Sequence, residues 1–258
     1  MDLVHALYYG IIEGITEFLP ISSTGHLMLA AKLFGAADSE FTKTFEIVIQ
    51  LGAILAVVVL YPKRLLVDRA SMIRIIAGFL PTAVIGLIFY KLVKTYLFGN
   101  IPVVLASLFF GGIALIIFER YMKTRSAPRE RTITDLSLKE SALIGTMQAI
   151  AIVPGVSRSA ATVIGGMFFG LSRAEAVEFS FLLAVPTMAA ATGLDLLKNY
   201  HLFTKDDAAA LLVGFVVSFA VALASIKWLL SFVRTHTFTP FGVYRIIIAF
   251  LGAWFLLD

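Results

Sequence analysis

Two stretches of the chain align with each other without a gap: residues 10–35, GIIEGITEFLPISSTGHLMLAAKLFG, and residues 145–170, GTMQAIAIVPGVSRSAATVIGGMFFG. Ser22 falls on Ser157 in this alignment, so the chain repeats itself at a spacing of 135 residues. In each copy, a Pro and a short cluster of Ser and Thr interrupt a run of apolar residues. Broken membrane helices have this pattern, and polar residues inside a bilayer usually serve a function. We therefore expect two interrupted helices that meet and form one site.

The composition is that of a multispanning membrane protein. Hydrophobic residues make up 59% of the chain, charged residues 15%, and the mean hydropathy is +0.93, which leaves too little polar surface to cover a soluble globule. Residues 1–5 lack the basic start of a cleavable signal peptide. Cys is absent, which excludes disulfides, thiolate nucleophiles and Cys-bound metals. The net charge of +4 sits in loops, so we expect contact with anionic lipid and no nucleic acid.

The predicted fold class is an all-α integral membrane protein with an inverted-topology repeat, six transmembrane helices and two re-entrant helical hairpins. One membrane domain, 1–258, consists of repeat one at 1–122, a polar connector at 123–136 and repeat two at 137–258. The six spans are predicted from apolar runs of about 20 residues. They lie at 45–61, 73–93, 101–119, 173–196, 208–230 and 241–257.

Basic residues set the predicted orientation. The 62–74 loop holds four Lys and Arg residues and the 120–139 stretch holds six, so we place both in the cytoplasm and both termini outside. Three spans in each half then invert the second half relative to the first. If the interrupted segments cross the membrane completely, the chain has eight spans and parallel repeats; the charge bias favours the first arrangement.

Local signals refine the helix boundaries. Capping boxes at Ser137 with Glu140 and at Ser172 with Glu175 predict helix starts near 138 and 173. Small residues spaced by four predict helices that approach each other closely. They occur in both copies, at Gly10 and Gly14 and at Gly145 and Ala149.

Glu13 and Glu17 are candidates for chemistry because they are four residues apart and share one helix face. Two carboxylates in an apolar run repel each other unless a cation or a donor lies between them. They can hold a divalent metal, act as a general base or relay protons. The alternative is that they reach the membrane interface or cap a helix. We favour a functional site because His26 follows within nine residues.

The first turn, PISSTGH at 20–26, precedes a predicted helix N-terminus. Free N–H groups, hydroxyls and the positive end of the helix dipole suit phosphate at such a place. Ordinary capping by Ser or Thr is the alternative. A lone His26 would more often be a structural histidine.

The second turn, PGVSRSAAT at 154–162, places Arg158 where the first copy has Ser23. A guanidinium at mid-membrane depth needs an anion, and its donors fit phosphate oxygens. A salt bridge to Glu13 or Glu17 is the alternative, and in an empty site both can hold. Together the halves supply the carboxylates, hydroxyls and cation that phosphoryl transfer requires.

Other polar residues in apolar runs have weaker interpretations. Some either line the same cavity or lie at helix ends: Glu46, Gln50, Gln148 and Glu178. Basic residues near span ends are expected to extend toward the interface: Arg173, Lys227 and Arg245.

At these residues the sequence resembles the undecaprenyl-diphosphate phosphatase family of bacterial membrane proteins, also described as bacitracin-resistance proteins. The matching stretches are ExxxE at 13–17, FLPISSTGH at 18–26, PGxSRSxxT at 154–162 and EFSFLLAVP at 178–186. The resemblance implies hydrolysis of undecaprenyl diphosphate, a C55 polyprenyl diphosphate, which recycles the carrier for peptidoglycan and other cell-wall glycans and confers bacitracin resistance. It also implies the bacterial inner membrane, a site open to the outer, periplasmic face, and a divalent cation, Mg or Ca, as cofactor. The expected partners are the lipid substrate, membrane lipid and, as an option, a second copy in a homodimer.

The resemblance also implies roles for single residues. Glu13 and Glu17 would hold the metal or activate the nucleophile, and Arg158 would clamp the diphosphate. Ser23 and His26 would sit at the reacting phosphorus. Further hydrogen bonds to the substrate would come from Ser22, Thr24, Ser157, Ser159 and Thr162. The nucleophile stays open among His26, Ser23 activated by His26, and water activated by a Glu.

A secondary transporter or lipid-phosphate flippase is the competing hypothesis. Inverted repeats with broken helices and midplane charges are equally its signature. His26 argues for an enzyme, because a phosphate carrier needs Arg and dipoles but neither a nucleophile nor a proton donor. A structural or channel-like scaffold would leave the intramembrane charges without purpose.

Overall fold

The computed structural model describes residues 2–35, 40–124, 131–199 and 207–256, and these ranges are almost entirely helical. Short 3₁₀ turns, η1 (Ile133–Asp135) and η2 (Ile150–Ile152), flank the seventh helix. In chain order the helices are α1 (Leu3–Thr16), α2 (Ser23–Leu33), α3 (Glu40–Leu60), α4 (Pro62–Leu66), α5 (Arg69–Tyr96), α6 (Ile101–Thr124), α7 (Leu138–Ala149), α8 (Arg158–Phe168), α9 (Arg173–Asn199), α10 (Ala208–Val233) and α11 (Thr239–Leu256).

Five of the described helices are long and apolar enough to cross a membrane: α5, α6, α9, α10 and α11. The sixth predicted span, 45–61, corresponds to a shorter apolar helix over Phe45–Leu60. The prediction of an all-helical membrane protein is therefore confirmed for the described ranges, and the count of six spans stays a prediction.

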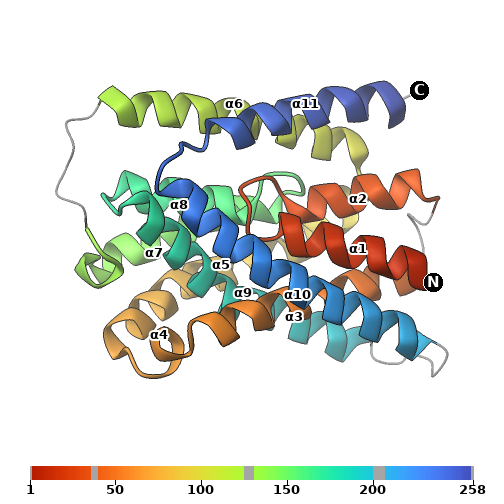
Figure 1. Ribbon diagram of the computed structural model, residues 1–258, viewed down its shortest axis with the longest axis horizontal. Helices are drawn as coiled ribbons and strands as arrows, with labels where there is room; N and C mark the ends of the chain where they lie inside the picture. The colour runs from red at the N-terminus through yellow and green to blue at the C-terminus, as the bar shows by residue number, and fades with distance from the viewer. Residues whose placement is uncertain (1, 36–39, 125–130, 200–206, 257–258) are drawn as a thin grey trace.

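The two interrupted segments extend toward opposite ends of the molecule. Figure 1 shows α1 and α2 reaching the end where both chain termini lie, whereas α7 and α8 lie toward the end that holds α4. Along one edge, α6 and α11 pack side by side. The turns between α1 and α2 and between α7 and α8 therefore lie in the interior.

Both turns end in the same unusual backbone conformation. Ser22 has φ 73° and ψ 94°, and Ser157 has φ 78° and ψ 111°. Among the described residues, these are the non-glycine residues with positive φ, a conformation that costs energy and is concentrated at functional sites. Each Ser caps the helix that follows, since its Oγ accepts a hydrogen bond from Gly25 N at 3.3 Å or from Ala160 N at 3.1 Å.

The predicted close approaches of helices are confirmed. A Cβ added at Gly10 or at Gly14 would lie 2.8 Å from a backbone oxygen of α10. A Cβ at Gly145 would overlap the backbone of Gly78 in α5. The glycines thus let α1 rest directly on α10, and α7 on α5, which fixes the two helices that lead into the turns.

The two predicted capping boxes have different outcomes. Ser137 N donates to Glu140 Oε2 at 2.7 Å and Glu140 N donates to Ser137 Oγ at 3.2 Å, as predicted. Ser172 caps α9 through Glu175 N, at 3.3 Å. The other half of this box was predicted wrongly, because the Glu175 carboxylate accepts instead from Ile133 N, at 2.8 Å. It thereby ties α9 to the turn before α7.

Candidate active site

A cavity of about 520 Å³ lies where the two turns meet α5 and α9. Its polar part is lined by side chains from both turns: Glu17, Ser22, Ser23, Thr24, Ser157 and Arg158. Its apolar part is lined by α5 and α9, including Phe79, Ala83, Leu87, Ala190 and Leu194. The cavity thus offers a charged end and an apolar wall to one ligand.

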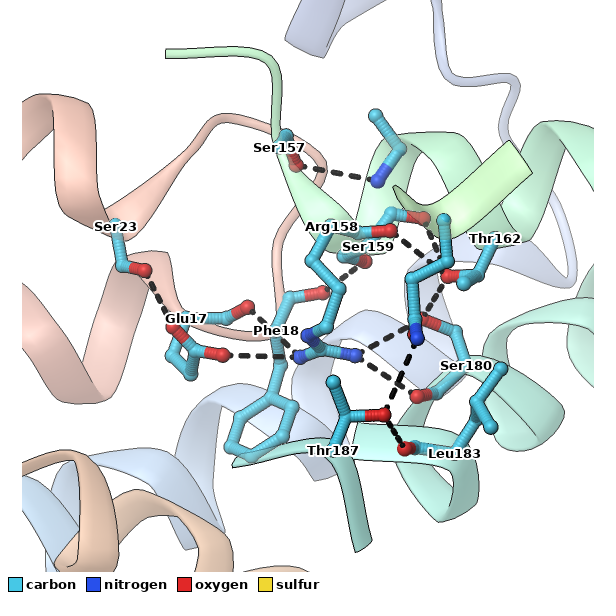
Figure 2. A network of polar contacts seen from close by, with 12 residues as sticks. Glu17, Phe18, Ser23, Ser157, Arg158, Ser159, Thr162, Ser180, Leu183 and Thr187 are labelled. Carbon is cyan, nitrogen blue, oxygen red and sulfur yellow. Dashed lines mark hydrogen bonds and ion pairs between the residues drawn. The ribbon is translucent and has the colours of Figure 1, made fainter. Parts of the chain in front are cut away.

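Glu17 joins the two turns at the polar end of the cavity. Its Oε1 accepts a hydrogen bond from Arg158 Nη2 at 3.0 Å, and its Oε2 accepts one from the Ser23 hydroxyl. Figure 2 shows Ser23 and Arg158 on opposite sides of the Glu17 carboxylate. The side chain of Glu17 is 5% exposed. The expected meeting of the two broken helices is therefore found, and the salt bridge that was named as the alternative role of Arg158 is formed with Glu17.

Arg158 is held in place by α9. Its Nη1 donates to Ser180 O at 2.9 Å, and the Ser180 hydroxyl accepts from Thr162 Oγ1 at 2.6 Å (Figure 2). Its Nε is buried and has no hydrogen-bond partner among the described residues. A buried donor without a partner is costly, and phosphate oxygens would satisfy it.

Glu13 lies behind Glu17 and does not line the cavity. It is fully buried, and neither of its carboxylate oxygens has a hydrogen-bond partner among the described residues. The negative charges of Glu17 and Glu46 disfavour a charge on Glu13, and the positive charge of Arg158 favours it. Two buried carboxylate oxygens without donors fit a hard cation.

The described residues do not complete a metal site by themselves, since no three His, Cys, Asp or Glu side chains gather as ligands within them. Mg²⁺ is commonly held by one or two carboxylates together with water and substrate phosphates. Glu13 and Glu17 therefore fit such a cation if a phosphate group completes its ligands.

His26 does not line the cavity that Glu17 and Arg158 line. Its Nδ1 is 2.8 Å from Ser22 O and its Nε2 is 2.9 Å from the Tyr244 hydroxyl. A carbonyl oxygen only accepts, so Nδ1 carries the hydrogen and Nε2 accepts from Tyr244. The His26 ring stacks on Tyr244 and lines a separate apolar groove. The role of His26 at the reacting phosphorus therefore has no support from this geometry and stays a prediction.

The predicted hydroxyl groups divide into two sets. Ser22, Ser23, Thr24 and Ser157 line the cavity. Ser159 and Thr162 are buried outside the cavity lining. Ser159 Oγ donates to Phe18 O at 2.8 Å, which ties the second turn to the first (Figure 2). In this arrangement Ser159 supports the site without facing the ligand space, and Thr162 does so through Ser180.

The other polar residues of the apolar runs fall into those that line the cavity and those that do not. Gln50 and Gln148 line the cavity, whereas Glu46 does not. Glu178 lies away from the cavity lining and forms an ion pair with Arg64 at 3.1 Å. Gln148 Nε2 donates to Thr82 and Thr187 hydroxyls, while its Oε1 is buried without a partner among the described residues.

Sequence reasoning did not identify several residues that shape the site. Ser180 lay inside a quoted motif without a role, and Tyr244 gave no local signal. Gln148 could have been ranked higher, because it aligns with Glu13 at the same spacing of 135 residues. For Arg245 the expectation of an interfacial side chain was wrong: it is fully buried. The physical reason is that backbone carbonyls satisfy its donors in the interior.

Comparison with known proteins identifies the family. Residues 6–251 match the family described as bacitracin resistance protein BacA. The chain belongs to this family. Among its bacterial relatives is an undecaprenyl-diphosphatase of Aquifex aeolicus (strain VF5), 50% identical over 252 residues that cover 98% of each chain. An undecaprenyl-diphosphatase of Sulfurihydrogenibium sp. (strain YO3AOP1) is 50% identical over 251 residues, covering 97% of this chain and 98% of the relative.

The likeness extends to other bacteria. An undecaprenyl-diphosphatase of Thermus thermophilus is 46% identical over 255 residues, covering 98% of this chain and 97% of the relative. The expected membership in this bacitracin resistance family is thereby confirmed. Because the match covers nearly the whole chain, both turns of the site lie inside the family's own region.

Proposed function

We propose that this member of the bacitracin resistance family is an undecaprenyl-diphosphatase, which hydrolyses undecaprenyl diphosphate to undecaprenyl phosphate and inorganic phosphate. The observation that carries the proposal is the nearly full-length similarity to relatives with this name, two of which are 50% identical to this chain. The cavity agrees with it, because a charged end and an apolar wall suit a diphosphate on a prenyl chain. A transporter or flippase has no comparable support.

The chain's own residues can bind the diphosphate. Arg158 offers its Nε, which no other described residue contacts by a hydrogen bond, and the Nη2 group that donates to Glu17. The N-termini of α2 and α8 add the positive ends of two helix dipoles. This charge stabilises the transition state of phosphoryl transfer, in which negative charge spreads over the phosphate oxygens.

Ser23 is the nucleophile that the geometry favours, because Ser23 lines the cavity and its hydroxyl donates to Glu17. In the proposed reaction Ser23 gives its proton to Glu17 while its oxygen bonds to the terminal phosphorus. The bond from that phosphorus to the bridging oxygen breaks, and undecaprenyl phosphate leaves with the electron pair. Water then attacks the phosphoserine and releases a proton to solvent, and Ser23 departs with the proton that Glu17 held.

A divalent cation, Mg or Ca, is part of the proposal. When bound, it would neutralise negative charge on the diphosphate oxygens. Glu13, whose two carboxylate oxygens have no hydrogen-bond partner in the described ranges, and Glu17 would hold it.

The proposed topology has six spans, two re-entrant hairpins, both termini outside and a cavity open to the outer face of the bacterial inner membrane. It is supported by the interrupted segments, which extend toward opposite ends of the molecule (Figure 1). The prenyl chain would lie along the apolar residues of α5 and α9, two helices long enough to span. The homodimer stays a prediction.

The experiment is release of phosphate from undecaprenyl diphosphate by the protein purified in detergent, with and without a chelator. Arg158→Ala should lose nearly all turnover, while Arg234→Ala, at an exposed arginine after α10, should keep it. Labelled phosphate should be trapped on denatured wild-type protein and not on Ser23→Ala. Wild-type protein that releases no phosphate from this lipid would refute the function; an acid-labile adduct on His26 would refute Ser23 as the nucleophile.

A further inference from the structure

Arg245 of α11 has a buried guanidinium that, within the described part of the chain, donates hydrogen bonds only to main-chain oxygens. Its side chain is 0% exposed, and among the described residues it forms no ion pair with a carboxylate. Its donors reach three elements of the fold. The acceptors are Pro20 O at 3.3 Å in the first turn, Gly155 O at 2.9 Å and Val156 O at 3.0 Å in the second turn, and Ser107 O at 3.0 Å and Leu108 O at 3.4 Å in α6.

These acceptors lie next to the two strained residues of the site. Val156 directly precedes Ser157, and Pro20 lies two residues before Ser22. A positive φ at a serine persists only where the surroundings hold it. The planar guanidinium fork of Arg245, with its five N–H donors, therefore contacts both turns close to their strained serines.

The same bonds fix the orientation of the peptide between Val156 and Ser157. In a trans peptide the C=O of one residue and the N–H of the next point in opposite directions. Because Val156 O points at Arg245, the N–H of Ser157 points away from Arg245. Ser157 lines the cavity, so Arg245 also fixes the orientation of a backbone N–H at the cavity wall.

A second observation comes from α6. Gly111 faces the guanidinium, and a Cβ built there would overlap its Nη2. A side chain at this position would push the fork away from its carbonyls. Arg245 can therefore occupy this position only because residue 111 has no side chain.

We infer that Arg245 is a positioning residue: it fixes the distance between the two turns and thereby holds Ser23 of the first opposite Arg158 of the second. Its expected effect on kcat rests on the proposed function, whereas its effect on the distance between the turns does not. A misplacement of about 1 Å at a reacting group can cost about 10²-fold in rate. Loss of the fork should therefore lower kcat more than it raises KM.

The test compares two variants. Arg245→Lys keeps the positive charge but removes the guanidinium fork. Gly111→Ala keeps Arg245 but puts a methyl group where the guanidinium lies. Both should lower kcat about 10²-fold with a smaller change in KM. The double variant should lose no more than Arg245→Lys alone, because both changes break the same contact. The matched control is Arg74→Lys, at another guanidinium that donates to backbone carbonyls, Leu136 O at 2.6 Å and Ala70 O at 2.7 Å, and it should keep the wild-type kcat.

A distance measurement gives a readout that does not depend on catalysis. The chain has no Cys, so in the double variant Leu33→Cys and Phe168→Cys the spin labels react with these two positions alone. Both positions are exposed and lie at the ends of α2 and α8. Adding Arg245→Lys or Gly111→Ala to this pair should shift or broaden the distance distribution, and Arg74→Lys should not. An unchanged distribution with wild-type kcat in a folded Arg245→Lys protein would overturn the inference. If Arg245→Lys does not fold, the same two measurements on Gly111→Ala take its place, and an unchanged distribution with wild-type kcat would again overturn the inference. If the wild-type protein hydrolyses no diphosphate, the proposed function fails and the distances still test Arg245.

Discussion

Glu17→Gln is an informative substitution because Glu17 contacts both halves of the site. The side chain accepts from the Ser23 hydroxyl and from Arg158 Nη2, the latter at 3.0 Å. Glutamine has nearly the same shape and keeps one oxygen that can accept from Arg158. It carries no charge and cannot take the proton of Ser23. The change therefore separates the chemical role of Glu17 from its role in packing.

The expected magnitudes differ for stability and for catalysis. A hydrogen bond to a charged group contributes about 1.5–3 kcal/mol, and glutamine retains part of the contact with Arg158. We therefore expect a loss of about 2 kcal/mol in the free energy of unfolding, which leaves the protein folded. Removal of a general base lowers the rate by about 10²–10⁴-fold. The fall in kcat should thus greatly exceed what partial unfolding explains.

The assay measures phosphate release by purified protein in detergent, with thermal unfolding followed by circular dichroism in the same detergent. The matched control is Glu178→Gln, which removes the carboxylate of another Arg–Glu pair, with Arg64 at 3.1 Å and outside the cavity lining. It should lower the unfolding temperature without a comparable fall in kcat. A folded Glu17→Gln protein with wild-type kcat would show that Glu17 takes no proton in the reaction.

Three further substitutions test other parts of the structure. Glu13→Gln puts a neutral amide in place of a buried carboxylate that has no donor among the described residues. In chelator the unfolding temperature of this variant should therefore be at least that of the wild type, and its half-maximal rate should need more cation. A lower unfolding temperature would contradict this reasoning. Gly145→Ala drives a Cβ into the backbone of α5, whereas Gly86→Ala meets nothing within 4 Å, so calorimetry should show a loss of about 1–3 kcal/mol for the first only. Hydrogen bonds from the hydroxyl and N–H of Ser71 lower the pKa of Asp68 from 3.8 to about 2. The stability that Asp68 adds is therefore present above pH 3.8 and lost as pH falls toward 2, and the unfolding temperature of Asp68→Asn should fall less over that window than that of the wild type.

The broken helices could be predicted from sequence because their signals are local. A Pro, a serine cluster and a glycine spacing recur 135 residues apart, as Ser22 and Ser157 illustrate, and each marks an interruption or a close contact by itself. A salt bridge from Arg158 to Glu13 or Glu17 was the alternative that charge suggested, since a membrane interior brings opposite charges together, and the structure pairs Arg158 with Glu17. These predictions used properties that side chains carry wherever they lie.

The features that could not be predicted depend on three-dimensional placement. Arg245 is stabilised by main-chain oxygens, and every residue has such an oxygen, so no sequence pattern indicates the partner. His26 does not line the cavity, and its Nε2 contacts the hydroxyl of Tyr244, 218 positions later. Glu175 gives up half of its capping box because Ile133 N comes within 2.8 Å. In each case a distant group competes successfully with the local one.

The repeat keeps the backbone of the two turns alike while the side chains on it differ, and the chemistry depends on that difference. Ser22 and Ser157 share the same strained conformation, yet the next position is Ser23 in one turn and Arg158 in the other. Two arginines facing each other would repel strongly at low dielectric, and two serines would leave a diphosphate without a counter-charge. With one of each, the first turn offers a nucleophile and the second offers the charge that binds its target. A substitution that restores the symmetry, Arg158→Ser, should therefore keep the turn and abolish turnover.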